Sequence, residues 1–123
     1  TKSNQNLVTT QRDITEQERI LLEQYNVKVI TNCDNEGKAF YDTLTLVKNA
    51  NVVVSSDTAL LHLAGCSRSK EQISIGMIVL GCEWRWNKNN SDAWYPDVKV
   101  IRQQNFREWS HAMNDLENSL VNL

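Results

Sequence analysis

The sequence contains little proline or glycine, with one proline and four glycines among its 123 residues. It has no linker, low-complexity tract or internal repeat, so we expect a single domain over residues 1–123 that is large enough to bury a core. No run approaches the roughly 18 apolar residues that a membrane-spanning helix needs. The formal net charge is only −2, so the composition gives no electrostatic case for a nucleic-acid partner.

The chain also lacks the hydrophobic region of a signal peptide, since it begins TKSNQNLVTT. It does not begin with Met, and we expect it to be a piece of a longer protein or a processed chain. Its three cysteines, Cys33, Cys66 and Cys82, form no C-x-x-C pattern. Free thiols in a reducing cytosol are therefore expected, and we predict a cytoplasmic protein.

Short apolar runs alternate with helical patterns along the chain. Strands are expected at residues 7–10, 27–31, 52–54, 73–80 and 98–102. Helices are expected from the capping-box spacing Thr15-x-x-Glu18 onward, over residues 39–49 and 59–65, and at the end of the chain. Strands joined by helices favour βαβ units, so we predict an α/β fold: a three-layer sandwich around a parallel five-stranded sheet.

Two of these helices are expected to bury an apolar face. In the first helix this face consists of Ile20, Leu21, Leu22 and Tyr25. In the closing helix it consists of Phe106, Trp109, Met113, Leu116 and Leu120.

Residues 51–65, with the sequence NVVVSSDTALLHLAG, are the centre of the predicted fold. The three valines predict a strand buried on both faces, followed by a short apolar helix with Asp57 or Ser56 as N-cap and Gly65 at its end. Such a unit places free N–H groups and the positive end of a helix dipole at the carboxyl edge of a sheet, where α/β proteins bind phosphate. The alternative is a well-capped strand–helix unit without a ligand.

Residues 81–97 have no regular period but contain Trp84, Trp86, Trp94 and Tyr95, with Arg85 between the first two tryptophans. One interpretation is a cleft, because flat aromatic rings suit sugars and nucleobases and arginine pairs with phosphate. The other is an aromatic lid that covers the sheet in place of a missing helix.

His62 follows Asp57 by five residues and lies on the predicted apolar helix. A hydrogen-bonded core histidine is favoured over a catalytic one. No nucleophile-elbow motif supports a Ser–His–Asp triad.

Several motifs in order resemble a known family. The stretch VVVSSDTALLHLAG is followed by WRW, WYP and RQ, which resembles the carboxyl-terminal domain of glycosyltransferases with the GT-B fold. More narrowly, it resembles the heptosyltransferase-like branch found at the end of bacterial tetratricopeptide-repeat proteins. LVTTQ is similar to the S-L-Q of that family, and AFYDT to its D-F-x-D-T helix start. The resemblance extends from about Leu7 to Leu120.

The resemblance implies a binding site for a nucleotide-sugar donor, with the diphosphate at the start of the D-T-A-x-x-H helix and no cofactor beyond that substrate. The implied donor-binding residues are Asp57, Thr58, Ala59, His62, Gln11, Trp84, Arg85 and Trp86. The sequence contains no D-x-D motif, so the resemblance implies no metal site.

The chain also departs from the family. The glycine-rich W-A-G-N-P-x-H segment and the amino-terminal acceptor domain, which carries the catalytic base, have no counterpart here, and SRSKEQISIG replaces a G-K-P-type turn. We therefore expect donor binding, and hexosyl or heptosyl transfer only with an added acceptor or repeat domain. Loss of the first strand would leave a Rossmann-like sheet in the flavodoxin-like order 2-1-3-4-5. The alternative is a non-catalytic binding or interaction module, or a gene fragment that retains the fold.

Overall fold

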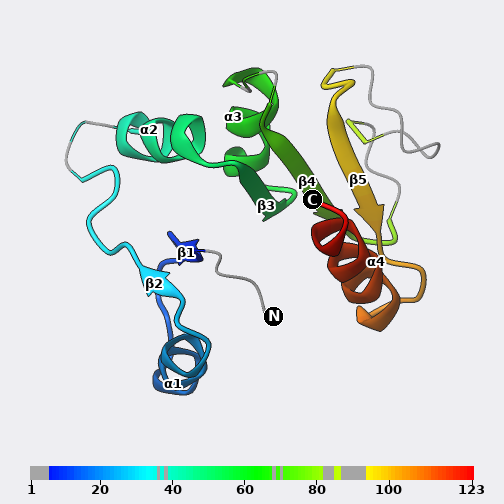
Figure 1. The fold of residues 1–123 in the computed structure, drawn as a ribbon, viewed down its shortest axis with the longest axis horizontal. Helices are drawn as coiled ribbons and strands as arrows, with labels where there is room; N and C mark the ends of the chain where they lie inside the picture. Colours follow the sequence, from blue (N-terminus) through cyan, green and yellow to red (C-terminus); the bar gives the residue numbers. More distant parts are fainter. Residues whose placement is uncertain are drawn as a thin grey trace. The chain divides into compact units, whose positions relative to one another are not determined.

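The computed structural model describes residues 6–35, 37, 39–67, 69, 71–81, 85–86 and 94–123. The chain falls into two compact units, Thr1–Thr43 and Leu44–Leu123, whose elements are labelled in Figure 1. The described residues form helices and parallel strands, so the predicted α/β class is confirmed. The prediction of a single domain stays a prediction.

The first unit contains one strand–helix–strand motif. β1 (Val8–Thr9) and β2 (Lys28–Val29) pair in parallel and are joined by α1 (Glu16–Gln24). The predicted capping box is present at the start of α1: Glu18 N donates to Thr15 Oγ1 at 3.3 Å, and Thr15 N donates to Glu18 Oε2 at 2.8 Å. These bonds satisfy backbone donors that have no acceptor within the helix.

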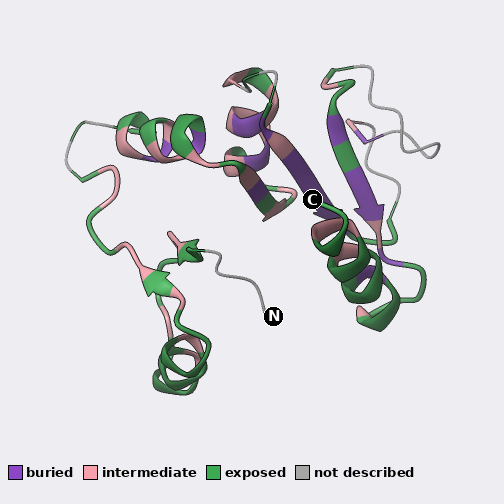
Figure 2. Ribbon diagram, viewed as in Figure 1, coloured by how far each residue is buried: buried purple, intermediate pink, exposed green. Residues whose placement is uncertain are grey.

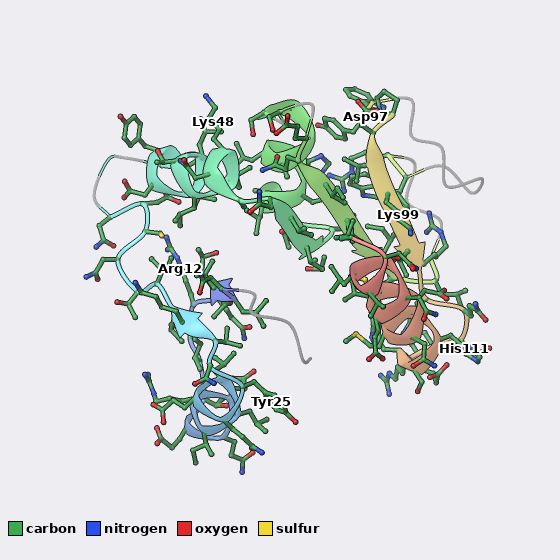
Figure 3. All side chains as sticks on the ribbon, viewed as in Figure 1. Arg12, Tyr25, Lys48, Asp97, Lys99 and His111 are labelled. Carbon is green, nitrogen blue, oxygen red and sulfur yellow. The ribbon has the colours of Figure 1, made fainter. Side chains whose placement is uncertain are left out.

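The apolar side predicted for α1 is not buried. None of its residues is buried, and Ile20, Leu21 and Tyr25 are each more than half exposed; Figure 3 labels Tyr25 beside α1. Among the described residues of this unit, Thr43 alone is buried. The prediction is wrong because spacing shows which side chains share a face, but not whether another element covers that face.

The second unit is built on a three-stranded parallel sheet in the order β3–β4–β5, formed by Val52–Ser56, Ile73–Ile78 and Val98–Arg102. β4 is central, and five of its six residues are buried, which Figure 2 shows in purple. β3 lies at an edge, where Val53 is buried but Val54 is 39% exposed. The prediction that this strand is buried on both faces is therefore wrong.

Helices cover the two faces of this sheet. On one face, Leu61 of α3 (Ala59–Ser67) packs with side chains of β4 and β5, namely Ile78, Val98 and Val100. On the other face, Ala112 of α4 (Ser110–Val121) packs with Ile75, Met77 and Ile101. Successive side chains of a strand point to opposite faces, so β4 contributes to both clusters.

The predicted five-stranded sheet is wrong. The strands form one sheet of β1 and β2 and another of β3, β4 and β5. Three of the predicted strand pairs are present, namely β2 with β1, β3 with β4, and β4 with β5. The predicted pairing of β1 with β3, which would join the two sheets, is absent from the described strands. β1 and β2 have two residues each, so they offer few backbone hydrogen bonds and little apolar surface for extending a sheet.

α2 (Tyr41–Asn49) begins in the first unit, and its first turn is capped by Asp34. Asp34 Oδ1 accepts from Asp42 N at 2.9 Å and from Thr43 N at 3.2 Å. Asp34 Oδ2 accepts from the Thr43 hydroxyl at 2.5 Å. The carboxylate thus satisfies N–H groups that have no acceptor inside the helix.

The other end of α2 lies in the second unit and is closed by Gln72, which is buried. Gln72 Nε2 donates to the Val47 carbonyl and, at 2.8 Å, to the Ala50 carbonyl. The side chain thus provides donors for carbonyls at the end of the helix.

The face predicted for the closing helix is correct in part. Trp109, Leu116 and Leu120 pack against the sheet, but Met113 is 53% exposed and Phe106 is 75% exposed. Phe106 precedes the helix, which begins only at Ser110, and is therefore out of register with it. No helix among the described residues is long and apolar enough to cross a membrane.

Candidate functional site

Asp57 and Thr58 form the turn between β3 and α3. The Thr58 carbonyl accepts hydrogen bonds from Leu61 N at 3.0 Å and from His62 N at 3.4 Å, which start the helix. Thr58 therefore holds the N-cap position, and the prediction of Asp57 or Ser56 there is wrong.

The Asp57 carboxylate lies between two side chains that can carry positive charge. Its Oδ2 is 3.7 Å from Arg85 Nη2, and its Oδ1 is 3.5 Å from His62 Nε2. Both distances fit an ion pair but exceed those of a good hydrogen bond, and Asp57 Oδ1 and His62 Nε2 have no hydrogen-bond partner among the described residues.

His62 is held by aromatic neighbours. Its ring stacks on Trp86, with centroids 5.4 Å apart and planes 27° apart, and its Nδ1 lies 3.2 Å from the Tyr95 hydroxyl. The same hydroxyl accepts a weak hydrogen bond from Cys66 Sγ at 3.7 Å. A tautomer protonated at Nε2 fits both contacts, because Nδ1 then accepts from Tyr95 while Nε2 faces Asp57.

Two aromatic side chains between β4 and β5, those of Trp86 and Tyr95, pack on one face of the sheet. Trp86 is 1% exposed and packs in the cluster around Leu61, with Tyr95 against it. The interpretation of an aromatic cover is thus confirmed for Trp86, whereas Trp94 is 62% exposed.

A pocket of about 250 Å³ is lined by His62, Arg85, Trp94 and Tyr95. It combines three aromatic or heteroaromatic rings with one guanidinium group, and the Arg85 side chain is 41% exposed. Ligand pockets usually enclose about 300–1,000 Å³. This pocket has room for a single ring rather than for a whole nucleotide.

Most of the predicted donor-binding residues belong to the second unit. The structure places Asp57, Thr58, Ala59, His62, Arg85 and Trp86 there. Gln11 belongs to the first unit, where its Nε2 donates to Glu18 Oε1 at 3.4 Å and where it lines a cleft of about 420 Å³ with Arg12 and Arg19. Trp84 lies outside the described residues.

Trp94 and Tyr95, which stand in the WYP motif, were candidates for lining a cleft but are not among the predicted donor-binding residues. The sequence signal that could have indicated a packed partner such as Tyr95 is Gly65, a glycine that was predicted to end the helix. α3 continues to Ser67, so that prediction is wrong. Gly65 lies inside the helix, and the Tyr95 ring packs directly on it, so this position has no room for a Cβ atom.

Neither of the described thiols, Cys33 and Cys66, is among the residues that line the 250 Å³ pocket. Cys33 and Cys66 are free, as predicted, and Cys82 lies outside the described residues. Desolvation raises the pKa of the Cys33 thiol, and the Asp34 and Asp42 carboxylates add to this effect, so Cys33 is held in its unreactive protonated form. In the part of the chain that the structure describes, no three His, Cys, Asp or Glu side chains are grouped to hold a metal.

No protein-family model, curated protein or solved structure matches this chain. The resemblance to heptosyltransferase-like proteins rests on the sequence motifs alone.

Proposed function

We propose that this chain binds the donor of a glycosyltransferase, a nucleotide sugar, and does not transfer the sugar by itself. The observation that carries the proposal is the pocket, in which Arg85 meets the rings of His62, Trp94 and Tyr95. Two of its lining residues, Arg85 and His62, lie within 4 Å of the turn residue Asp57. The pocket is therefore close to the first turn of α3.

The diphosphate of such a donor needs positive charge and N–H donors. Arg85 offers a planar guanidinium group that can bind two phosphate oxygens at once. Its contact with Asp57, at 3.7 Å, is longer than a good hydrogen bond. The N–H groups of Ala59 and Leu60 precede the first hydrogen bond of α3 and have no acceptor within the helix.

The sugar or base needs a flat apolar surface. Trp94, 62% exposed, and Tyr95 provide such a surface in the pocket. The pocket volume fits one ring, so the proposal places one ring of the donor there and its phosphates toward Arg85 and the helix start.

Fold and motifs support the same proposal. Parallel strands in the order β3–β4–β5 with helices on both faces are typical of doubly wound, Rossmann-like or flavodoxin-like domains. The D-T-A-x-x-H, WRW, WYP and RQ motifs support the donor domain of a GT-B enzyme. Transfer would then require a second, acceptor-binding domain.

The experiment is a calorimetric titration of the chain with ADP, UDP and GDP. We expect saturable binding of one nucleotide, weakened about tenfold or more by Arg85→Met, because one charge-assisted hydrogen bond accounts for at least that factor. The control is Lys99→Met, which removes the same charge from a residue that bonds to α4 (Ser119) instead. A folded wild-type chain that binds none of the three nucleotides, or an Arg85→Met variant that binds normally, contradicts the proposal.

A second candidate is a non-catalytic interaction module. The Asp57–Arg85 contact favours it, because the arginine charge already has an opposite charge beside it without any ligand. The same titration separates the two functions, since such a module binds none of the three nucleotides.

A further inference from the structure

Arg102, the last residue of β5, donates three hydrogen bonds to the segment that follows β4. Its Nη1 donates to Val79 O at 3.2 Å and to Gly81 O at 3.1 Å, and its Nη2 donates to Trp86 O at 2.9 Å. A guanidinium group carries its donors in a fixed planar fork. One side chain thus joins three backbone carbonyls that are up to seven residues apart in the sequence.

The neighbouring Gln103 holds the start of the same segment. Its N donates to Ile78 O at 2.8 Å, and its Oε1 accepts from Leu80 N at 3.3 Å. Gln103 is 4% exposed, so the side chain is itself fixed by its surroundings. The RQ pair therefore holds the segment at residues 78–81 and again at Trp86.

The part of the segment that Arg102 holds at Trp86 also contains a residue that lines the pocket. Trp86 stacks on His62 and is buried, and the residue before it, Arg85, lines the pocket. Arg102 is not among the residues that line the pocket. Apart from its charge, Arg102 can therefore act on a ligand only through the positions of Arg85 and Trp86.

We infer that Arg102 is a positioning residue, which fixes Arg85 and Trp86 beside α3 and so sets the affinity of the pocket for an anionic ligand. The identity of that ligand rests on the proposed function. The positioning of Arg85 and Trp86 does not, and it is measured without any ligand.

The test uses two variants and one control on the same strand. Arg102→Met removes the fork and the charge, whereas Arg102→Lys keeps the charge and loses the planar fork. Lys99→Met is the matched control. Lys99, labelled in Figure 3, donates from Nζ to Ser119 Oγ at 2.7 Å and not to this segment. If both Arg102 variants lose amide protection at Arg85 and Trp86, the cause is the lost planar fork rather than the lost charge.

The first readout is amide hydrogen exchange at Arg85 and Trp86. Near-ultraviolet circular dichroism adds a signal from the packed rings of Trp86 and Tyr95. We expect at least tenfold faster exchange and a weaker aromatic signal in Arg102→Met, a smaller change in Arg102→Lys, and no change in Lys99→Met. Far-ultraviolet dichroism verifies that each variant is folded. If Arg102→Met does not fold, Arg102→Lys decides by the same readout.

The second readout is titration with the nucleoside diphosphate that binds the wild-type chain, where we expect about tenfold weaker binding in Arg102→Met. Unchanged exchange at Arg85 and Trp86 in both Arg102 variants overturns the positioning role. Changed exchange with unchanged affinity overturns the link to the pocket. A wild-type chain that binds no nucleotide refutes the proposed function, while the exchange data still decide whether Arg102 positions the two residues.

Discussion

A Cβ atom on Gly65 would lie 2.6 Å from both Cγ and Cδ1 of the Tyr95 ring. These atoms lie at the base of the ring, so no rotation of its far end relieves the contact. The Tyr95 ring therefore packs directly against the backbone of α3 at Gly65. This position brings the Tyr95 hydroxyl to His62 and Cys66.

We predict that Gly65→Ala destabilises the protein by about 1–3 kcal/mol, in the range of overpacked cores. The usual effect is opposite, since alanine stabilises a helix interior by about 1 kcal/mol relative to glycine. Urea unfolding followed by circular dichroism measures the difference. In the background Tyr95→Ala, the same substitution should become stabilising. Equal destabilisation in both backgrounds would show that Tyr95 is not the cause.

A second prediction concerns Gln72, whose side-chain amide closes the end of α2. Methionine has a similar length but no donor, so Gln72→Met leaves the Ala50 carbonyl without this bond. We expect a loss of about 1–3 kcal/mol in the free energy of unfolding. The control Gln104→Met, at an exposed position, should change stability by less than about 0.5 kcal/mol. Equal effects of the two substitutions would contradict this role.

A third prediction concerns α1, in which no residue is buried. We therefore expect its stability to depend on local signals such as the Thr15–Glu18 capping box. Thr15→Ala should destabilise the helix by about 1 kcal/mol, seen as faster amide exchange in α1 alone. Gln17→Ala, at an exposed position of the same turn, should leave exchange unchanged or slow it. Unchanged exchange in Thr15→Ala would mean that another contact holds the helix.

Local patterns predicted those elements in which local preference and burial agree. β5 has the predicted bounds, β4 differs from the prediction only at its end, and the capping box starts α1 as expected. In each case the pattern of a few consecutive residues determines the structure.

The remaining features depend on contacts between distant residues. Val54 is exposed because β3 is an edge strand, which the valine run itself does not reveal. Tyr95 is placed by packing on Gly65, thirty residues earlier, and Arg102 acts through hydrogen bonds to three carbonyls of the segment after β4. The motifs singled out both regions, but only the fold assigns roles to these residues.

The last prediction is a pH dependence at Asp34. The Thr43 hydroxyl, followed by the backbone N–H groups of Thr43 and Asp42, lowers the pKa of this carboxyl. A carboxyl whose pKa is lower in the folded state stabilises that state above the unfolded pKa, near about 4, and the stabilisation is lost as the pH falls through the folded value. Carbon-13 NMR of the Asp34 carboxyl should therefore show a midpoint below that of an exposed aspartate.

Thr43→Val tests the cause, because it keeps the shape of the side chain and removes the hydroxyl that bonds to Asp34 Oδ2. We expect it to raise the pKa of Asp34 toward the ordinary value and to reduce the acid sensitivity of the first turn of α2. Thr45→Val, at an exposed position of the same helix, should leave the titration of Asp34 unchanged. If Thr43→Val leaves the midpoint where it was, the backbone N–H groups account for the lowered pKa. The hydrogen bond from the Thr43 hydroxyl then helps to hold Asp34 at the start of α2 without lowering its pKa.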